Sequence, residues 1–139
     1  ITNTLVNTGA VAGFVRYNIV ATAPAVLGGC QSQSIVFQVN VEPAPVANNV
    51  LRTVCSDAPG GNTFLTDLTA LQNSVNNTGG VTFAWFQDAA LTTPIATPAA
   101  HTVTNAVPVF VEVDNGQCTK VATVTFTVNP SPSVTTSVT

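Results

Sequence analysis

Apolar and polar residues alternate along four segments of this 139-residue chain, a pattern typical of half-buried β-strands. Residues 108–113 and 121–128 alternate, and the Asn115-Gly116 pair between them favours a tight hairpin. Residues 14–20 and 35–41 alternate in the same way across a longer connection that contains glycine. The pattern therefore predicts two β-hairpins.

The two hairpins repeat one another in sequence with a period near 88 residues, which is the length of one small β-sandwich. Each copy ends in a Pro-x-Pro segment, which cannot donate hydrogen bonds to a sheet and favours an extended linker. The matched positions are Cys30 with Cys118 (spacing 88), Phe37 with Phe126 (89), and Pro43-Ala44-Pro45 with Pro130-Ser131-Pro132 (87).

This period divides the chain into repeats. We expect residues 1–46 to be the last strands of one repeat, residues 47–131 to be a complete repeat, and residues 132–139 to lead into a following one. The chain is then an internal segment of a longer protein. The predicted fold class is all-β, with tandem immunoglobulin-like antiparallel β-sandwich repeats.

Within the complete repeat we expect further strands at residues 64–71, 80–86 and 102–105. Val81, Phe83 and Trp85 share one face of the second of these strands. Val124 and Phe126 share the apolar face of residues 121–128. The predicted core therefore contains Trp85, Phe83, Phe126 and Val124.

Charged residues make up only 6% of the chain, against about 25% in an ordinary soluble domain. Arg16, Arg52 and Lys120 are its only cations, so it lacks the basic patch that nucleic acids and anionic membranes require. The most apolar window, residues 11–29, is interrupted by Arg16 and Pro24, which argues against a membrane span. Three cysteines and a surface of Thr, Ser, Asn and Gln indicate an extracellular protein in an oxidising compartment.

The expected sandwich topology assigns the cysteines. Its first strand starts at the end of the domain where the last hairpin turns, which places Cys55 near Cys118. We therefore predict a Cys55–Cys118 disulfide that encloses nearly the whole domain. Cys30 has the position of Cys118 in the preceding repeat, so we expect it to be unpaired in residues 1–139 and its partner to lie upstream. Strand and linker lengths disfavour a Cys30–Cys55 bridge.

Candidate chemistry is sparse. His101, the only histidine, has no Ser or Cys nucleophile motif beside it, and we expect it in a solvated loop. The cysteine spacing does not favour zinc, and a calcium site would need Asp57 and Asp114 to converge. Asn76-Asn77-Thr78 is a formal glycosylation acceptor that marks an exposed loop. We predict no catalytic residue, no cofactor and no metal.

Several segments together resemble a known family: residues 68–75, 81–88, 91–95, 115–118 and 122–130 are similar to the Ig-like repeats of very large bacterial surface proteins. Residues 1–8, Tyr17, Gly29-Cys30 and residues 37–41 resemble the end of a PKD-like repeat from the same proteins. Such repeats occur in adhesins of gliding bacteria, of the SprB type, that are exported by type IX secretion. The resemblance implies a surface stalk and carries over no catalytic residue.

The sequence leaves two hypotheses. The first is a non-catalytic structural segment of a bacterial cell-surface adhesin or filament. Its expected partners are neighbouring repeats of the same chain, with surface polysaccharide or the secretion and motility machinery as further candidates. The alternative is a carbohydrate- or ligand-binding module of a secreted protein. This alternative needs an exposed aromatic platform, for which Phe86 and Phe110 are the candidates because their parity is opposite to that of Trp85 and Val111.

Overall fold

The computed structural model describes residues 4–133, and its chain divides into two compact units, Ile1–Ala44 and Pro45–Thr139. The division lies two residues before the boundary expected from the repeat. Of the segment expected to lead into a following repeat, residues 134–139 lie outside the described residues.

The described residues form strands with little helix. The elements are β1 (Gly13–Ile19), the 3-10 helix η1 (Ala25–Leu27), β2 (Ile35–Val41), β3 (Val50–Pro59), β4 (Thr63–Thr66), η2 (Thr69–Leu71), α1 (Gln72–Val75), β5 (Thr82–Phe86), η3 (Pro98–Ala100), β6 (His101–Thr104), β7 (Val109–Asp114) and β8 (Thr119–Ser131). The all-β prediction is therefore confirmed.

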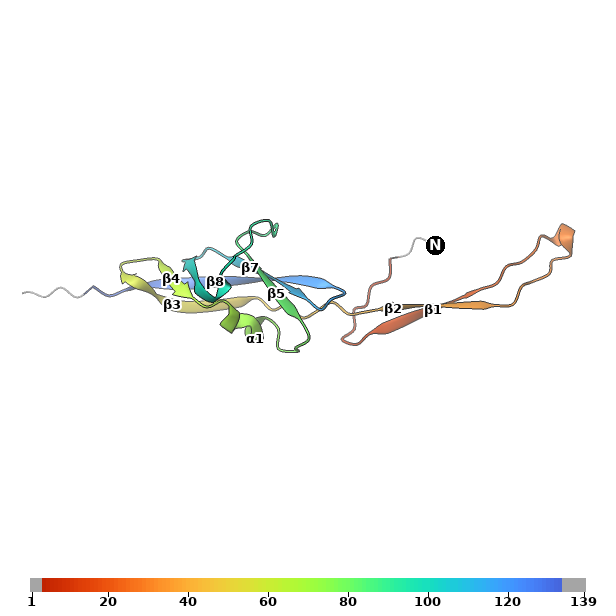
Figure 1. Ribbon diagram of the computed structural model, residues 1–139, viewed down its shortest axis with the longest axis horizontal. Coiled ribbons are helices and arrows are strands. Elements are labelled where there is room, and N and C mark those ends of the chain that lie inside the picture. Colours follow the sequence, from red (N-terminus) through yellow and green to blue (C-terminus); the bar gives the residue numbers. More distant parts are fainter. Residues whose placement is uncertain (1–3, 134–139) are drawn as a thin grey trace, which may run out of the picture. The chain divides into compact units, whose positions relative to one another are not determined.

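The second unit is a sandwich of a four-stranded sheet, in the order β3-β8-β7-β5, and a two-stranded sheet, β4-β6. β8 runs the length of the unit with β3 beside it (Figure 1). The β3–β8 pair is parallel, with Val50 opposite Val124 and Cys55 opposite Asn129, whereas the other pairs in the unit are antiparallel. The antiparallel pairing expected from the sequence therefore holds for these other pairs, and β3–β8 is the exception because the first and last strands run in the same direction as neighbours.

The core of this unit lies where the alternating apolar residues of β7, β8 and β5 face inward. Trp85, Val124 and Phe126 are at most 4% exposed, and Phe83 is partly buried against them. The rest of the buried apolar cluster comes from the helical segment and the residue before it, from the loop after β5, from β6 and from the same strands: Leu68, Leu71, Val75, Ile95, Val103, Val109, Val111, Val113, Ala122 and Val128.

The turn between β7 and β8 follows directly from its sequence. Gly116 has a φ of +85°, a backbone conformation that glycine adopts at little cost. Asp114 Oδ1 accepts a hydrogen bond from Gly116 N at 2.7 Å, and Asn115 Oδ1 accepts one from Cys118 N at 2.8 Å. Short polar side chains thus hold the turn that the Asn-Gly pair predicts.

The strand expected at residues 64–71 is wrong in its second half. β4 ends at Thr66, and Asp67 Oδ1 then accepts hydrogen bonds from Thr69 N (2.8 Å) and Thr69 Oγ1 (2.6 Å). A carboxylate that bonds two residues ahead turns the backbone out of a strand. The chain continues as η2 and α1, whose Leu71 and Val75 close one side of the core.

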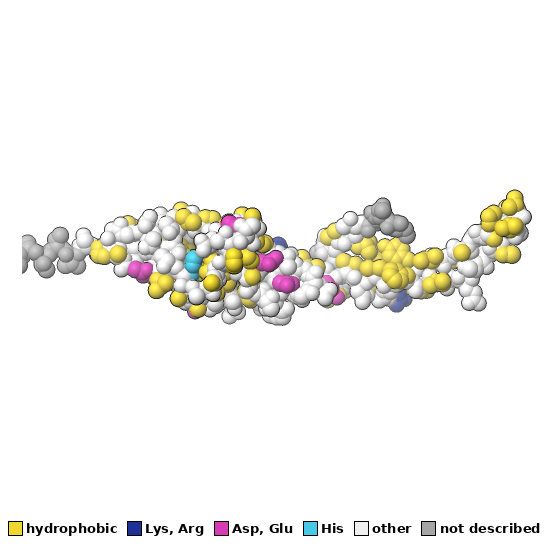
Figure 2. Space-filling view, turned by 45° about the horizontal axis from the view of Figure 1, so that its top comes forward, with side chains coloured by type: hydrophobic (Ala, Val, Ile, Leu, Met, Phe, Trp, Pro, Cys, Tyr) yellow, Lys and Arg dark blue, Asp and Glu magenta, His cyan; other side chains and the backbone are white. Residues whose placement is uncertain are grey.

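The first unit is the β1–β2 hairpin, with Gly13 opposite Val41 and Ile19 opposite Ile35. Its strands agree with the predicted segments to within one residue. Figure 2 shows hydrophobic side chains gathered over this unit and few charged ones. No described residue of the unit is buried, and its large exposed apolar side chains are Leu5, Val6, Val11, Phe14, Ile19, Val20, Val26, Leu27, Ile35, Val36 and Phe37.

Candidate functional site

The cysteines of the second unit lie at its two ends. Cys118 is half-buried in the β7–β8 turn. Cys55 is an exposed free thiol on β3, which is the edge strand of the four-stranded sheet. The prediction of a Cys55–Cys118 disulfide is therefore corrected.

The β3–β8 register gives the physical reason for the correction. Cys55 is opposite Asn129, which lies eleven residues along β8 from Cys118. At about 3.3 Å per residue the two Cα atoms are roughly 36 Å apart, far beyond the limit of about 7 Å for a disulfide. The error arose because β3 begins at Val50 rather than at Cys55, and it begins opposite Val124 rather than at the turn.

We define the proximal end of the second unit as the end where the chain enters it, and the distal end as the end where β8 finishes. At the proximal end, Asn49 Oδ1 accepts a hydrogen bond from Thr123 N at 2.9 Å, so the incoming chain runs beside the start of β8. At the distal end, Pro59 is paired with Ser131. Cys118 therefore belongs to the proximal end and Cys55 to the distal end.

A buried serine holds the distal end together. Ser56 is 5% exposed, and its Oγ donates to Ala58 O at 2.6 Å and accepts from Ser131 N at 2.9 Å. Ser131 Oγ donates in return to Ser56 O at 2.5 Å. These bonds tie the end of β8 to the edge strand directly beside Cys55. Sequence reasoning missed this pair, because neither serine stands in a recognisable motif.

A buried asparagine does the same at the proximal end. Asn76 is 3% exposed, its Nδ2 donates to Val46 O at 2.8 Å, and its Oδ1 accepts from Thr78 N at 2.9 Å. Asn48 N also donates to Val75 O at 2.9 Å. The expectation that residues 76–78 mark an exposed acceptor loop was wrong for Asn76, whose amide is used to anchor the incoming chain.

The sequence model of one family, the Flavobacterium inter-domain disulphide bond domain, matches residues 51–132. The chain belongs to this family. The matched segment contains Cys55 and Cys118 and covers nearly all of the sandwich. A domain whose cysteines lie at its opposite ends is suited to disulfides between domains rather than within one. No curated protein matches the chain.

The third cysteine, Cys30, lies in the β1–β2 connection of the first unit and is an exposed free thiol. Its carbonyl accepts a hydrogen bond from Ala23 N at 2.9 Å, which continues the hairpin beyond the paired strands. Both Cys30 and Cys118 therefore lie between the two strands of a hairpin, Cys30 in the first unit and Cys118 in the second.

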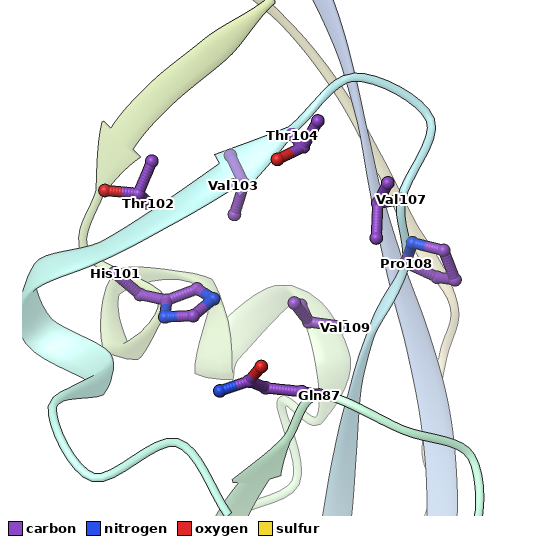
Figure 3. Close-up of a pocket in the computed structure, with 8 residues that line it drawn as sticks. All are labelled: Gln87, His101, Thr102, Val103, Thr104, Val107, Pro108 and Val109. Atoms are coloured by element: carbon purple, nitrogen blue, oxygen red, sulfur yellow. The ribbon is translucent and has the colours of Figure 1, made fainter. Parts of the chain in front are cut away.

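The second unit has a pocket of about 160 Å³ lined by residues of and near β6 and β7. Figure 3 shows His101 of β6 and Gln87, which follows β5, turned toward the same space. His101 begins β6 and is half-buried, so the expectation of a solvated loop was wrong. Burial lowers the pKa of His101 below its ordinary 6.5. Typical ligand pockets hold about 300–1,000 Å³, so this pocket is smaller than a typical ligand site and has room for a few waters or a molecule of about the size of benzene.

Each of the four aspartates accepts a hydrogen bond from a backbone N–H group of its own part of the chain. Asp57, at the distal end, accepts from Leu65 N at 2.5 Å, whereas Asp114, at the proximal end, accepts from Gly116 N at 2.7 Å. The convergence that a calcium site needed therefore does not occur. Hydrogen bonds from Thr69 and Thr92 lower the pKa of Asp67 and Asp88, respectively, below the ordinary 3.8. Within residues 4–133, no group of three or more His, Cys, Asp or Glu side chains is arranged to hold a metal.

The aromatic residues on the outer face bear on the carbohydrate-binding alternative. Phe86 and Phe110 are directly opposite each other on β5 and β7, and both are half-buried. Phe86 also forms an isolated bridge with Pro94. A sugar-stacking platform needs exposed ring faces, which this pair offers only in part.

In the part of the chain that the structure describes, no helix has the length and apolarity to cross a membrane.

Proposed function

We propose that this chain is a non-catalytic structural segment of a large secreted bacterial cell-surface adhesin or filament. Its sandwich is one link in a series of similar domains, joined by short Pro-x-Pro linkers and by disulfides between neighbours. The family to which the chain belongs supports the inter-domain role.

The observation that carries the proposal is the parallel pairing of β3 with β8. Because the first and last strands run side by side in one direction, the chain enters and leaves the sandwich at opposite ends. Domains of this kind can be strung in series without the chain turning back. A stretching force along the series of domains then acts on the hydrogen bonds between β3 and β8.

The surface chemistry supports an extracellular location. Charged residues make up 6% of the chain, and the outer face of β8 carries threonines, so the sandwich has few cations that could bind nucleic acids or anionic membranes. The resemblance to SprB-type repeats extends the proposal to adhesion in gliding motility and to export by type IX secretion. The candidate partners remain neighbouring repeats, surface polysaccharide and the motility machinery.

The size and location of the native polypeptide test this proposal. An antibody raised against residues 47–131 would be used on a denaturing, reducing gel of the source cells, with and without protease treatment of intact cells. We expect a band of several hundred kilodaltons that disappears when intact cells are treated. A cytoplasmic protein of the same cells is the control and must survive. A band near 14 kDa, the mass of the chain, or a band that resists protease, contradicts the proposal.

Binding of the chain to insoluble polysaccharides distinguishes the structural segment from a carbohydrate-binding module. We expect no retention beyond that of a reference protein of similar charge. Retention that Phe86→Ala abolishes, while the domain stays folded, would favour a carbohydrate-binding module instead.

A further inference from the structure

We propose that Asn115 is a self-modification site, at which the side-chain amide leaves as ammonia and a carboxylate takes its place. The reaction is the cyclisation of an asparagine onto the backbone nitrogen of the residue that follows it. The groups that the reaction needs come together in the β7–β8 turn, at the proximal end of the second unit. This chemistry needs no neighbouring domain and is therefore independent of the proposed function.

The attacking atom is the backbone nitrogen of Gly116. A side chain on the following residue is the usual steric obstacle to this attack, and glycine has none. A Cβ atom built at Gly116 would meet no heavy atom within 4 Å apart from its chain neighbours, and the residue is exposed. The nitrogen is therefore open to the reaction and to water.

A carboxylate is placed to take the proton of that nitrogen. Asp114 Oδ1 accepts a hydrogen bond from Gly116 N at 2.7 Å. An amide nitrogen becomes a nucleophile only as it gives up its proton, and a base within hydrogen-bond distance assists that step. Asp114 therefore has the geometry of a general base for Gly116 N.

The carbonyl that is attacked is held by two backbone donors. Asn115 Oδ1 accepts hydrogen bonds from Gln117 N at 3.0 Å and from Cys118 N at 2.8 Å. Two N–H groups on a carbonyl oxygen stabilise the negative charge that develops there during attack, as an oxyanion hole does. The bond to Gln117 N also folds the side chain back toward Gly116 N, which lies between the two residues. The reacting carbon and nitrogen are thus positioned before their bond forms.

The atoms of the reaction balance with water as the only co-reactant. Gly116 N gives its proton to Asp114 and bonds to Cγ of Asn115, which closes a succinimide ring. The Cγ–Nδ2 bond breaks, and Nδ2 takes the proton from Asp114 and leaves as ammonia. Water then opens the ring at either carbonyl and yields aspartate or isoaspartate at position 115. Each product adds one negative charge to a chain whose formal net charge is −3.

Asn76 is a natural comparison within the same unit. Its Oδ1 also accepts a hydrogen bond from the residue two positions ahead, Thr78 N, at 2.9 Å. However, its side chain is only 3% exposed, and its Nδ2, the group that would leave, donates to Val46 O at 2.8 Å. The residue that follows is Asn77 rather than glycine. We therefore expect Asn115 to react and Asn76 to persist.

Storage of the chain at neutral pH and body temperature tests the proposal. The peptides that contain Asn115 and Asn76 are followed by mass spectrometry, which detects the exchange of the amide NH₂ for OH. The same chain kept unfolded in urea retains the Asn-Gly sequence but loses the hydrogen bonds of the turn. We expect Asn115 to be converted in the folded chain at least as fast as in urea. An intact Asn115, or a slower reaction in the folded chain than in urea, overturns the inference.

Two aspartate variants test the base. Asp114→Asn keeps a side-chain oxygen for Gly116 N but removes the carboxylate, and we expect conversion of Asn115 to slow at least about 10-fold, because a positioned general base commonly contributes roughly 100-fold or more. Asp67→Asn is the matched control, since Asp67 also accepts from the backbone nitrogen two residues ahead, and we expect no change in the rate at Asn115. Equal rates in the unchanged chain and in Asp114→Asn overturn the proposal. The comparison in urea decides the outcome if Asp114→Asn does not fold.

Discussion

At the scale of single residues, the buried polar side chains of this sandwich are found where the chain enters and leaves it. Ser56 at the distal end and Asn76 at the proximal end each satisfy their hydrogen-bonding groups with the backbone of a segment more than 25 residues away. A buried polar group is retained at low cost only when it is bonded in this way. Both residues therefore hold the ends of the domain rather than its middle.

Replacing Asn76 should loosen the proximal end. Asn76→Ala removes the donor to Val46 O and the acceptor for Thr78, and it leaves the Val46 carbonyl without this partner. We expect the free energy of unfolding to fall by about 1–3 kcal/mol, measured by urea denaturation with the fluorescence of Trp85, the only tryptophan. The adjacent and exposed Asn77→Ala is the matched control, with an expected change within about 0.5 kcal/mol. Equal effects of the two changes would contradict this role.

Because His101 is half-buried, we predict that the stability of the second unit depends on pH. Because its pKa in the folded protein is lowered below 6.5, the unfolded chain binds the proton more readily. Stability is then full above pH 6.5 and decreases as the pH falls through the range between 6.5 and the lowered pKa. We expect the urea midpoint to decrease from pH 7.5 to pH 5.5, and His101→Gln to flatten this decrease. The carboxylates of Asp67 and Asp88 lose their contribution only below pH 3.8, outside this range.

At the scale of elements, the sequence predicted the hairpins well and the connections poorly. Alternation and the Asn115-Gly116 turn locate β7 and β8, because a strand with one buried face and a short turn depends on its own residues. The prediction of a strand at residues 64–71 was wrong in its second half, because the Asp67 side chain competes with the sheet for backbone hydrogen bonds. The prediction of a Cys55–Cys118 disulfide was wrong because the register between β3 and β8 depends on residues far apart in sequence. The alternation within each strand does not determine that register.

The β1–β2 hairpin should be far less stable than its counterpart in the second unit. Both hairpins have the same pattern, but β7 and β8 are flanked by β5 and β3, whereas β1 and β2 pair only with each other in the described chain. An isolated two-stranded hairpin is marginal in water. In the 139-residue chain alone we expect the amide of Phe126 to exchange with solvent at least about 1,000-fold more slowly than the amide of the matched Phe37. Similar protection of both amides by hydrogen exchange would show that the first unit is folded independently.

At the scale of the whole second unit, the direction of the strands determines how it bears load. The chain on either side pulls on the start of β3 and the end of β8, which are neighbouring parallel strands. This geometry loads their hydrogen bonds together in shear rather than one after another. The sequence predicted the sandwich, but its resistance to pulling depends on this one parallel pair.

Single-molecule pulling measures that difference. With handles at residues 47 and 133 we expect a higher unfolding force than with handles at residues 47 and 116, both at the proximal end, which peel the sheet apart strand by strand. The two attachments use the same domain, so its stability is unchanged between them. Equal forces in the two geometries would rule out the β3–β8 pair as the element that bears load.

The scarcity of cations has a consequence for the survival of such a protein among digestive enzymes. A trypsin-like protease cleaves after Arg or Lys, and here these are only Arg16 in β1, Arg52 in β3 and Lys120 in β8. Arg52 and Lys120 stand in the four-stranded sheet, where neighbouring strands already use the backbone groups that a protease would bind, so only Arg16, in the marginal β1–β2 hairpin, is open to cleavage. The linkers and turns, which a protease reaches most easily, hold no Arg or Lys at all within residues 4–133. The linkers and turns of the described chain therefore lack the residue after which this common class of secreted protease cleaves.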